Sequence, residues 1–95
     1  MSAHHVYLAL TNDGAYYCGY ACDPDARQAV HNAGRGAKIL RGKLPVSLAY
    51  VRRFATKSAA LKFECGLKGR THAYKRTLAR RWLTRHRLVR RRNGP

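Results

Sequence analysis

The sequence predicts an α+β domain in which a small three-stranded antiparallel sheet is flanked by helices. Val6, Leu8 and Leu10 alternate with the residues between them, as in a β-strand. A turn signal follows at 12–14, and β-favouring residues come after it. Asp23-Pro24 is a typical helix start. At 95 residues the chain is long enough for one small domain with a modest core. The remaining elements are expected at residues 45–51 (strand), 58–68 (helix) and 71–86 (helix).

The first two strands form a predicted β-hairpin around residues 12–14. With a three-residue loop that ends in a left-handed glycine, the register places Tyr7 opposite Gly19 and Tyr17 opposite Ala9. The two phenols then become diagonal neighbours on one face, and the small residues beside them leave room for a substrate. A shift of one residue in the register would separate the rings.

The first helix is expected to run from Pro24 to about Asn32, with Asp23 as its N-cap. Arg27 and His31 are four residues apart and therefore share a helix face, so a guanidinium and an imidazole converge on one site. The alternative is a solvent-exposed arginine and an ordinary surface histidine.

Apolar side chains in the later elements are expected to pack in the core. In the third strand, Leu48 and Tyr50 are predicted to share one face with Val46. In the last helix, which Thr71 caps, a stripe at four-residue spacing favours packing over base stacking. That stripe consists of Tyr74, Leu78 and Trp82.

The charge balance indicates a polyanionic partner. Lysine and arginine number 20 against 4 aspartate and glutamate, which gives a formal net charge of +16. Nucleic acid is the first candidate partner. The charge does not separate DNA from RNA, although we favour DNA. An anionic membrane surface ranks lower, because the basic C-terminal segment is not cleanly amphipathic. Without a membrane-spanning run or a signal-like segment, we expect a soluble, cytoplasmic protein that is not secreted.

Two basic regions are predicted to contact nucleic acid. One is the glycine-rich loop at residues 34–43, which lacks the spacing of a P-loop, and the other is the C-terminal third. We expect a domain over residues 1–84 and a flexible basic tail over 85–95 that orders on phosphate. The candidate contacts are Arg35, Lys38, Arg41, Lys43, Lys68, Arg70, Lys75 and Arg80.

Three cysteines, Cys18, Cys22 and Cys65, raise the alternative of a structural zinc site with His4 and His5. The chain has no Cys-x-x-Cys pair, and in the expected strand the side chain of Cys18 points to the face of the sheet opposite that of Tyr17. Reduced thiols are therefore the favoured interpretation.

The order of these motifs resembles the GIY-YIG nuclease superfamily, most closely its small stand-alone, URI-like members. The residues that resemble it are Val6-Tyr7-Leu8, Tyr17-x-Gly19, residues 23–32 with Arg27 and His31, residues 34–38, and residues 60–68 with Glu64. The resemblance extends from about Val6 to about Leu78. Val6 and Cys18 occupy the two positions that are isoleucine in the family name. Side chains at these positions contribute to packing more than to the reaction.

The resemblance implies the GIY-YIG endonuclease fold and the hydrolysis of phosphodiester bonds. Glu64 would hold one divalent cation, Mg²⁺ or Mn²⁺, although from spacing alone a salt bridge is favoured for this carboxylate. Tyr17 is the expected general base or water-orienting group, with Tyr7 as its hydrogen-bonded neighbour in phenolate-favouring surroundings. The sequence does not settle which tyrosine takes the proton. Arg27 would stabilise phosphoryl charge, and His31 would assist the nucleophile or the phosphate.

Two functions of different class follow. The first is a metal-dependent DNA endonuclease that prefers single strands or particular structures and acts in DNA repair or recombination. The alternative is a non-catalytic RNA- or DNA-binding protein, attached to a ribonucleoprotein, that retains the fold.

Overall fold

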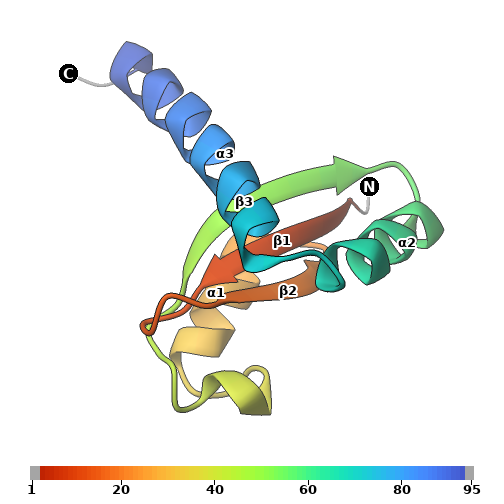
Figure 1. Cartoon of the computed structure of the whole chain (residues 1–95), viewed down its shortest axis with the longest axis vertical. Coiled ribbons are helices and arrows are strands. Elements are labelled where there is room, and N and C mark those ends of the chain that lie inside the picture. Colours follow the sequence, from red (N-terminus) through yellow and green to blue (C-terminus); the bar gives the residue numbers. More distant parts are fainter. Residues whose placement is uncertain (1–2, 94–95) are drawn as a thin grey trace.

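The computed structural model describes residues 3–93, and Figure 1 shows how the elements are arranged. Three strands and three α-helices form an α+β fold, as the sequence predicts. The elements are β1 (His4–Leu10), β2 (Tyr16–Ala21), α1 (Pro24–Asn32), the short 3-10 helix η1 (Lys38–Leu40), β3 (Ser47–Phe54), α2 (Lys57–Lys68) and α3 (His72–Asn93).

The sheet is antiparallel, with β1 between β2 and β3. The hairpin register is confirmed, since Tyr7 lies opposite Gly19 and Tyr17 lies opposite Ala9. The loop ends in Gly14, whose φ of 86° is the left-handed conformation that such a loop requires. Both tyrosines therefore lie on the same face of the sheet.

A β-bulge in β3 overturns one detail of the predicted core. Leu8 pairs with Tyr50 and Ala9 pairs with Leu48, so Ala49 is an extra residue between them. The bulge turns Tyr50 to the opposite face of the sheet from Leu48, where simple alternation predicts that the two side chains share a face. Tyr50 and Leu48 accordingly pack in different core clusters.

Helices cover both faces of the sheet, and each face has its own core cluster (Figure 1). On the face covered by α2, the buried residues are Val6, Leu8, Cys18, Ala60 and Leu67. On the face covered by α1 and η1, they are Tyr7, Ala9, Ala21, Leu40 and Val46. We refer to these as the α2 face and the α1 face. The hydroxyl and imidazole groups of the candidate site belong to the α1 face.

Helix α1 forms where the sequence predicts it. The Asp23 side chain accepts a hydrogen bond from the Ala26 N–H (3.2 Å), and Gly34 follows the helix with a φ of 79°. The Asn32 side chain bonds to both the N–H (2.7 Å) and the carbonyl (3.0 Å) of Val46. These two bonds tie the end of α1 to the segment that enters β3.

Helix α3 begins after a Thr71 cap and crosses β3 to project beyond the sheet (Figure 1). The predicted apolar stripe is partly wrong: Leu78 and Trp82 are half-buried, but Tyr74 is exposed and the neighbouring Ala79 is buried instead. The buried positions shift around the helix because α3 crosses the sheet at an angle, so successive turns pack against different neighbours.

The backbone continues as helix from residue 85 to Asn93, where the sequence predicts a flexible tail. The side chains of the basic run at 87–92, and residues 94–95, lie outside what the structure describes. The division of the chain at residue 84 stays a prediction. Over residues 3–93, no helix combines the length and apolar character needed to cross a membrane.

Candidate active site

A hydrogen bond between Tyr7 and His31 is the centre of the candidate site. The Tyr7 hydroxyl lies 2.9 Å from Nε2 of His31, and both side chains are fully buried, each about 1 % exposed. The sequence predicts a bond from Tyr7 to Tyr17 instead. The alternative of a surface histidine is wrong, because His31 in the last turn of α1 faces the sheet.

The loop after α1 determines the protonation state of His31. The backbone N–H of Ala37 donates to Nδ1 of His31 over 3.2 Å, so that nitrogen accepts and carries no proton. The neutral ring then holds its hydrogen on Nε2 and donates it to the Tyr7 oxygen. The phenolic hydrogen of Tyr7 remains free to point elsewhere.

Two glycines make room for this pair. A Cβ atom at Gly36 would lie 1.9 Å from Nδ1 of His31, and one at Gly19 would lie 2.5 Å from the Tyr7 hydroxyl. The expectation that Gly19 leaves space for a substrate is therefore wrong, since the phenol of Tyr7 fills that space. Any side chain at either position would displace the hydrogen-bonded pair.

Tyr17 lies beside the pair, on the adjacent strand. Its ring centroid is 6.3 Å from that of Tyr7 and 5.5 Å from that of His31, with an edge-to-face contact to the imidazole. Tyr17 is half-buried, and Arg27 on α1 is exposed. The structure thus brings Tyr7, Tyr17 and His31 together, with Arg27 one helical turn before the histidine.

Burial shifts the pKa values of Tyr7 and His31. Loss of water raises the pKa of Tyr7 to about 12, and the nearby Tyr17 adds to this effect, while the Arg27 charge opposes it. Burial also lowers the pKa of His31, and Arg27 lowers it further. Both groups are therefore neutral near pH 7, and the expected phenolate character does not apply to Tyr7.

Glu64 lies on the other side of the sheet from this cluster. Helix α2 packs on the α2 face, and the Glu64 carboxylate is 3.7 Å from the ammonium group of Lys68. The thiol of Cys18 in β2 donates weakly to the Glu64 carbonyl (3.9 Å). Glu64 is therefore next to the edge strand that carries Tyr17, but its helix covers the opposite face. Glu64 thus makes an ion pair in this structure, and its role as a metal ligand stays a prediction.

The cysteines do not gather. Cys18 is buried on the α2 face, and Tyr17 lies on the other face, as predicted. Cys22 and Cys65 are exposed free thiols. Burial, followed by the nearby Glu64 charge, raises the pKa of Cys18 to about 11, which makes it a poor nucleophile. Within residues 3–93 no three histidine, cysteine or acidic side chains are grouped as zinc would need.

The predicted nucleic-acid contacts fall into two groups. Arg35, Lys38, Arg41 and Arg80 are exposed, and Lys75 is half-buried with its ammonium 3.5 Å from the Lys68 carbonyl. The others have side-chain partners within the protein: Lys43 pairs with Asp13 (3.6 Å), Lys68 pairs with Glu64, and the Arg70 guanidinium lies 4.8 Å from the Tyr74 ring centroid.

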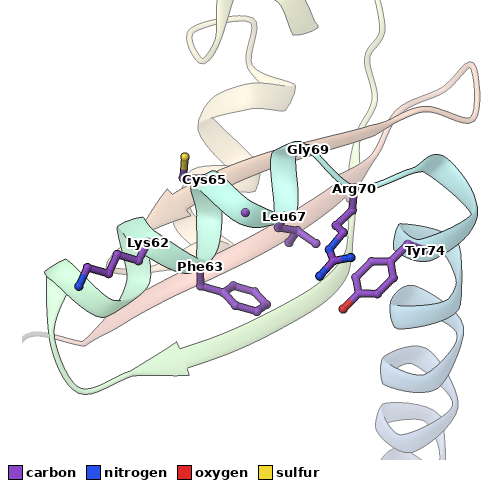
Figure 2. A pocket seen from close by; sticks show the side chains of 8 residues that line it. Lys62, Phe63, Cys65, Leu67, Gly69, Arg70 and Tyr74 are labelled. Atoms are coloured by element: carbon purple, nitrogen blue, oxygen red, sulfur yellow. The ribbon is translucent and has the colours of Figure 1, made fainter.

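Arg70 also lines a groove of about 620 Å³ between α2 and α3. Figure 2 shows Phe63, Arg70 and Tyr74 pointing toward one another across it, whereas Lys62 and Cys65 point away. This groove lies on the α2 face, so it is separate from the Tyr7 and His31 cluster.

Comparison with known proteins identifies the family. The model of the GIY-YIG catalytic domain matches residues 3–78. The chain belongs to the GIY-YIG family. Its curated relatives include UPF0213 proteins of Halobacterium salinarum and Staphylococcus epidermidis, each 45 % identical over 75 residues. These alignments cover 79 % of this chain, and 97 % and 92 % of the respective relatives.

Solved structures agree with this GIY-YIG assignment. The UPF0213 protein of Bacillus halodurans is 36 % identical, with a TM-score of 0.51 over 80 % of this chain and 81 % of that protein. A protein from E. faecalis is 33 % identical, with a TM-score of 0.56 over 93 % and 90 %. The chain therefore belongs with the UPF0213 proteins within the GIY-YIG family.

Sequence reasoning missed Gly36 and Ala37, which contact His31. It assigned their loop to nucleic-acid contact because of its cations. The path of the loop back to the sheet through η1 determines which backbone amide bonds to the imidazole. No local sequence pattern predicts that path. A glycine a few residues after a helical histidine was the one available signal.

Proposed function

We infer that this protein is a metal-dependent endonuclease that hydrolyses phosphodiester bonds in DNA. The observation that supports this most is the buried Tyr7 and His31 pair with Tyr17 and Arg27 around it, in a domain of a nuclease family. A protein that only binds nucleic acid does not need a buried phenol and imidazole bonded to each other.

We assign different roles to the two tyrosines. Tyr7 stays protonated at neutral pH because its pKa is raised to about 12. Its side chain is also about 1 % exposed, so it supports the groups around it and does not act as the base. His31 holds the Tyr7 hydroxyl in place and is a positioning residue. Tyr17 is left to orient the water and take its proton, and Arg27 stabilises charge on the phosphoryl oxygens.

Glu64 is the residue that would hold a divalent cation. It is the only glutamate, its side chain is 15 % exposed, and its partner Lys68 is an exposed lysine that water readily replaces. One carboxylate fits Mg²⁺ or Mn²⁺, because these ions keep several waters and take further ligands from substrate phosphates. When bound, the cation would activate water and neutralise phosphate charge.

The favoured substrate is an exposed strand, such as a single strand or flap in DNA repair or recombination. A single small domain with a basic surface grips nucleic acid mainly through phosphates, and an exposed strand enters its site more easily than a duplex. We expect the protein to act on DNA in the cytoplasm.

One observation favours the second candidate, a non-catalytic nucleic-acid-binding protein. Glu64 and the tyrosine cluster lie on different faces of the sheet, and the glutamate is paired with Lys68. In that case the charge of +16 alone would provide binding.

Cleavage of labelled single-stranded, flapped and duplex DNA, and of RNA, tests the proposal. Each substrate is incubated with Mg²⁺, Mn²⁺ or EDTA, using the wild type, Glu64→Gln and the control Cys65→Ser, an exposed residue of the same helix. We expect metal-dependent cutting of single-stranded or flapped DNA that Glu64→Gln loses and Cys65→Ser keeps. Salt-sensitive binding without cutting under any metal would contradict the nuclease and support the second candidate.

A further inference from the structure

We propose that the groove between α1, β3 and α3 holds one unstacked base of the bound nucleic acid. This groove measures about 830 Å³, within the range of small-molecule sites. Its lining includes His5, Asp25, Gln28, Arg53, Trp82 and His86. The proposal rests on the proposed function only in taking nucleic acid as the ligand.

A buried polar atom in the lining has no partner. Nδ1 of His5 is shielded from solvent and, among residues 3–93, makes no hydrogen bond. Leaving such an atom unpaired costs free energy. Because the His5 side chain is only half-buried, a turn of its ring would let a ligand in the groove complete this bond. A heterocyclic base has N–H groups and ring nitrogens that suit either tautomer of the imidazole.

The other polar groups favour a base over a phosphate. Asp25 is one of only four acidic residues, and it has no salt-bridge partner among the described residues. Its carboxylate would repel a phosphate but accepts hydrogen bonds from base amino groups. Gln28 uses Oε1 to accept the Leu48 N–H (2.7 Å), which leaves its amide hydrogens as donors.

Aromatic side chains of α3 complete the groove. Trp82 and His86 stack on each other, with ring centroids 4.9 Å apart and planes 10° from parallel. Proteins that bind single strands stack successive bases on such aromatic groups, and exposed cations beside them contact the backbone. Arg81 and Arg85, in the same stretch of α3, are exposed. The pair therefore extends a stack that an incoming base can join.

The groove lies on the same face of the sheet as the candidate active site. His5 and Tyr7 are two residues apart in β1, and consecutive same-face residues of a strand are roughly 7 Å apart. Arg53 and Val51 lie opposite them in β3. Helix α1 separates the two sites, with Gln28 on the groove side. A base held in the groove would thus belong to a nucleotide near the one that is cut.

Tryptophan fluorescence tests the proposal directly, because Trp82 is the only tryptophan in the chain. The full-length protein is titrated in EDTA with a single-stranded octanucleotide and with a matched sugar–phosphate chain that lacks bases, at equal salt. We expect quenching by the first ligand only, and about tenfold weaker binding of the second, as the loss of one stacked base predicts.

Two variants test the groove and a third is the control. His5→Leu removes the unpaired atom, so it should keep or raise stability while weakening binding of the octanucleotide several-fold. Trp82→Leu leaves no tryptophan, so binding of dye-labelled ligands to the variants is followed by fluorescence anisotropy. Trp82→Leu should lose the preference for bases, whereas Tyr74→Leu, an exposed aromatic residue outside the groove on the same helix, should keep it.

Equal quenching and equal affinity for the two ligands would overturn the proposal, as would His5→Leu binding like the wild type. No cutting is needed for these measurements. A protein that cuts DNA without a Trp82 response contradicts the groove alone, and a response without cutting contradicts the nuclease alone.

Discussion

The α1 face and the α2 face of the sheet bury their large side chains in different ways. On the α1 face, Tyr7 and His31 are fully buried and hydrogen-bonded to each other. On the α2 face, Val6 and Leu8 are equally buried but pack in a cluster of aliphatic and aromatic side chains, with Glu64 at its margin. A buried hydrogen-bonded pair requires a fixed donor–acceptor geometry and a cavity that fits both side chains. Aliphatic side chains can repack with little loss if their total volume is kept. The α1 face should therefore be far less tolerant of substitution.

The largest effect is expected at Gly36. Gly36→Ala places a Cβ 1.9 Å from His31, which expels the imidazole and leaves the Tyr7 hydroxyl and the Ala37 amide unpaired. We expect a loss of about 2–4 kcal/mol in the free energy of unfolding, from overpacking and lost hydrogen bonds together. Gly42→Ala is the matched control, because a Cβ there meets no atom within 4 Å. Urea denaturation yielding the same stability for both variants would refute this packing.

A smaller effect is expected from removing single hydroxyl groups. Tyr7→Phe leaves Nε2–H of His31 buried without an acceptor, which should cost about 1–3 kcal/mol. Tyr17→Phe should cost little, because among residues 3–93 its hydroxyl has no hydrogen-bond partner and the ring contacts remain. Thermal unfolding of the two variants measures the difference; an equal cost would mean that the bond to His31 does not distinguish the tyrosines.

On the α2 face, Glu64→Gln should change stability by less than about 1 kcal/mol, since among the described side chains Glu64 pairs with one exposed lysine. The same substitution is expected to abolish cleavage if Glu64 holds the cation. Guanidinium denaturation in parallel with the cleavage assay separates these effects. A strongly destabilised Glu64→Gln protein would show that the carboxylate is part of the core.

The smallest effect concerns pH. The pKa of His31 is lower in the folded state than its ordinary value of 6.5, so the unfolded chain binds a proton more readily. This contribution to stability is complete above pH 6.5 and decreases as the pH falls from there through the lowered pKa. Unfolding at pH 7.5 and at pH 5 should show a smaller decrease for His31→Gln than for the wild type; identical decreases would contradict it.

The sequence was sufficient for the features that local patterns control. The Asp23 cap, the end of α1 near Gly34 and the hairpin register all follow from turn and cap chemistry, and the register correctly places Tyr7 opposite Gly19. Local patterns also place Arg27 one turn before His31.

The errors came from long-range geometry. The bulge at Ala49 reverses the facing of Tyr50, and no residue type at that position signals it. The partner of Tyr7 depends on how the loop through Ala37 seats His31, and the position of Glu64 depends on which face α2 covers. Such features depend on contacts between segments far apart in the chain, which periodicity does not record.

The most direct test of the account compares cutting with binding on one substrate. Cleavage rates and dissociation constants for a flapped DNA are measured with Mg²⁺ for the wild type, Arg27→Gln, Tyr17→Phe and Glu64→Gln, with Cys65→Ser as the control. We predict that the three site variants cut at least about 100-fold more slowly while binding within a few-fold of the wild type. Wild-type rates in Arg27→Gln and Tyr17→Phe would contradict an active site on the α1 face.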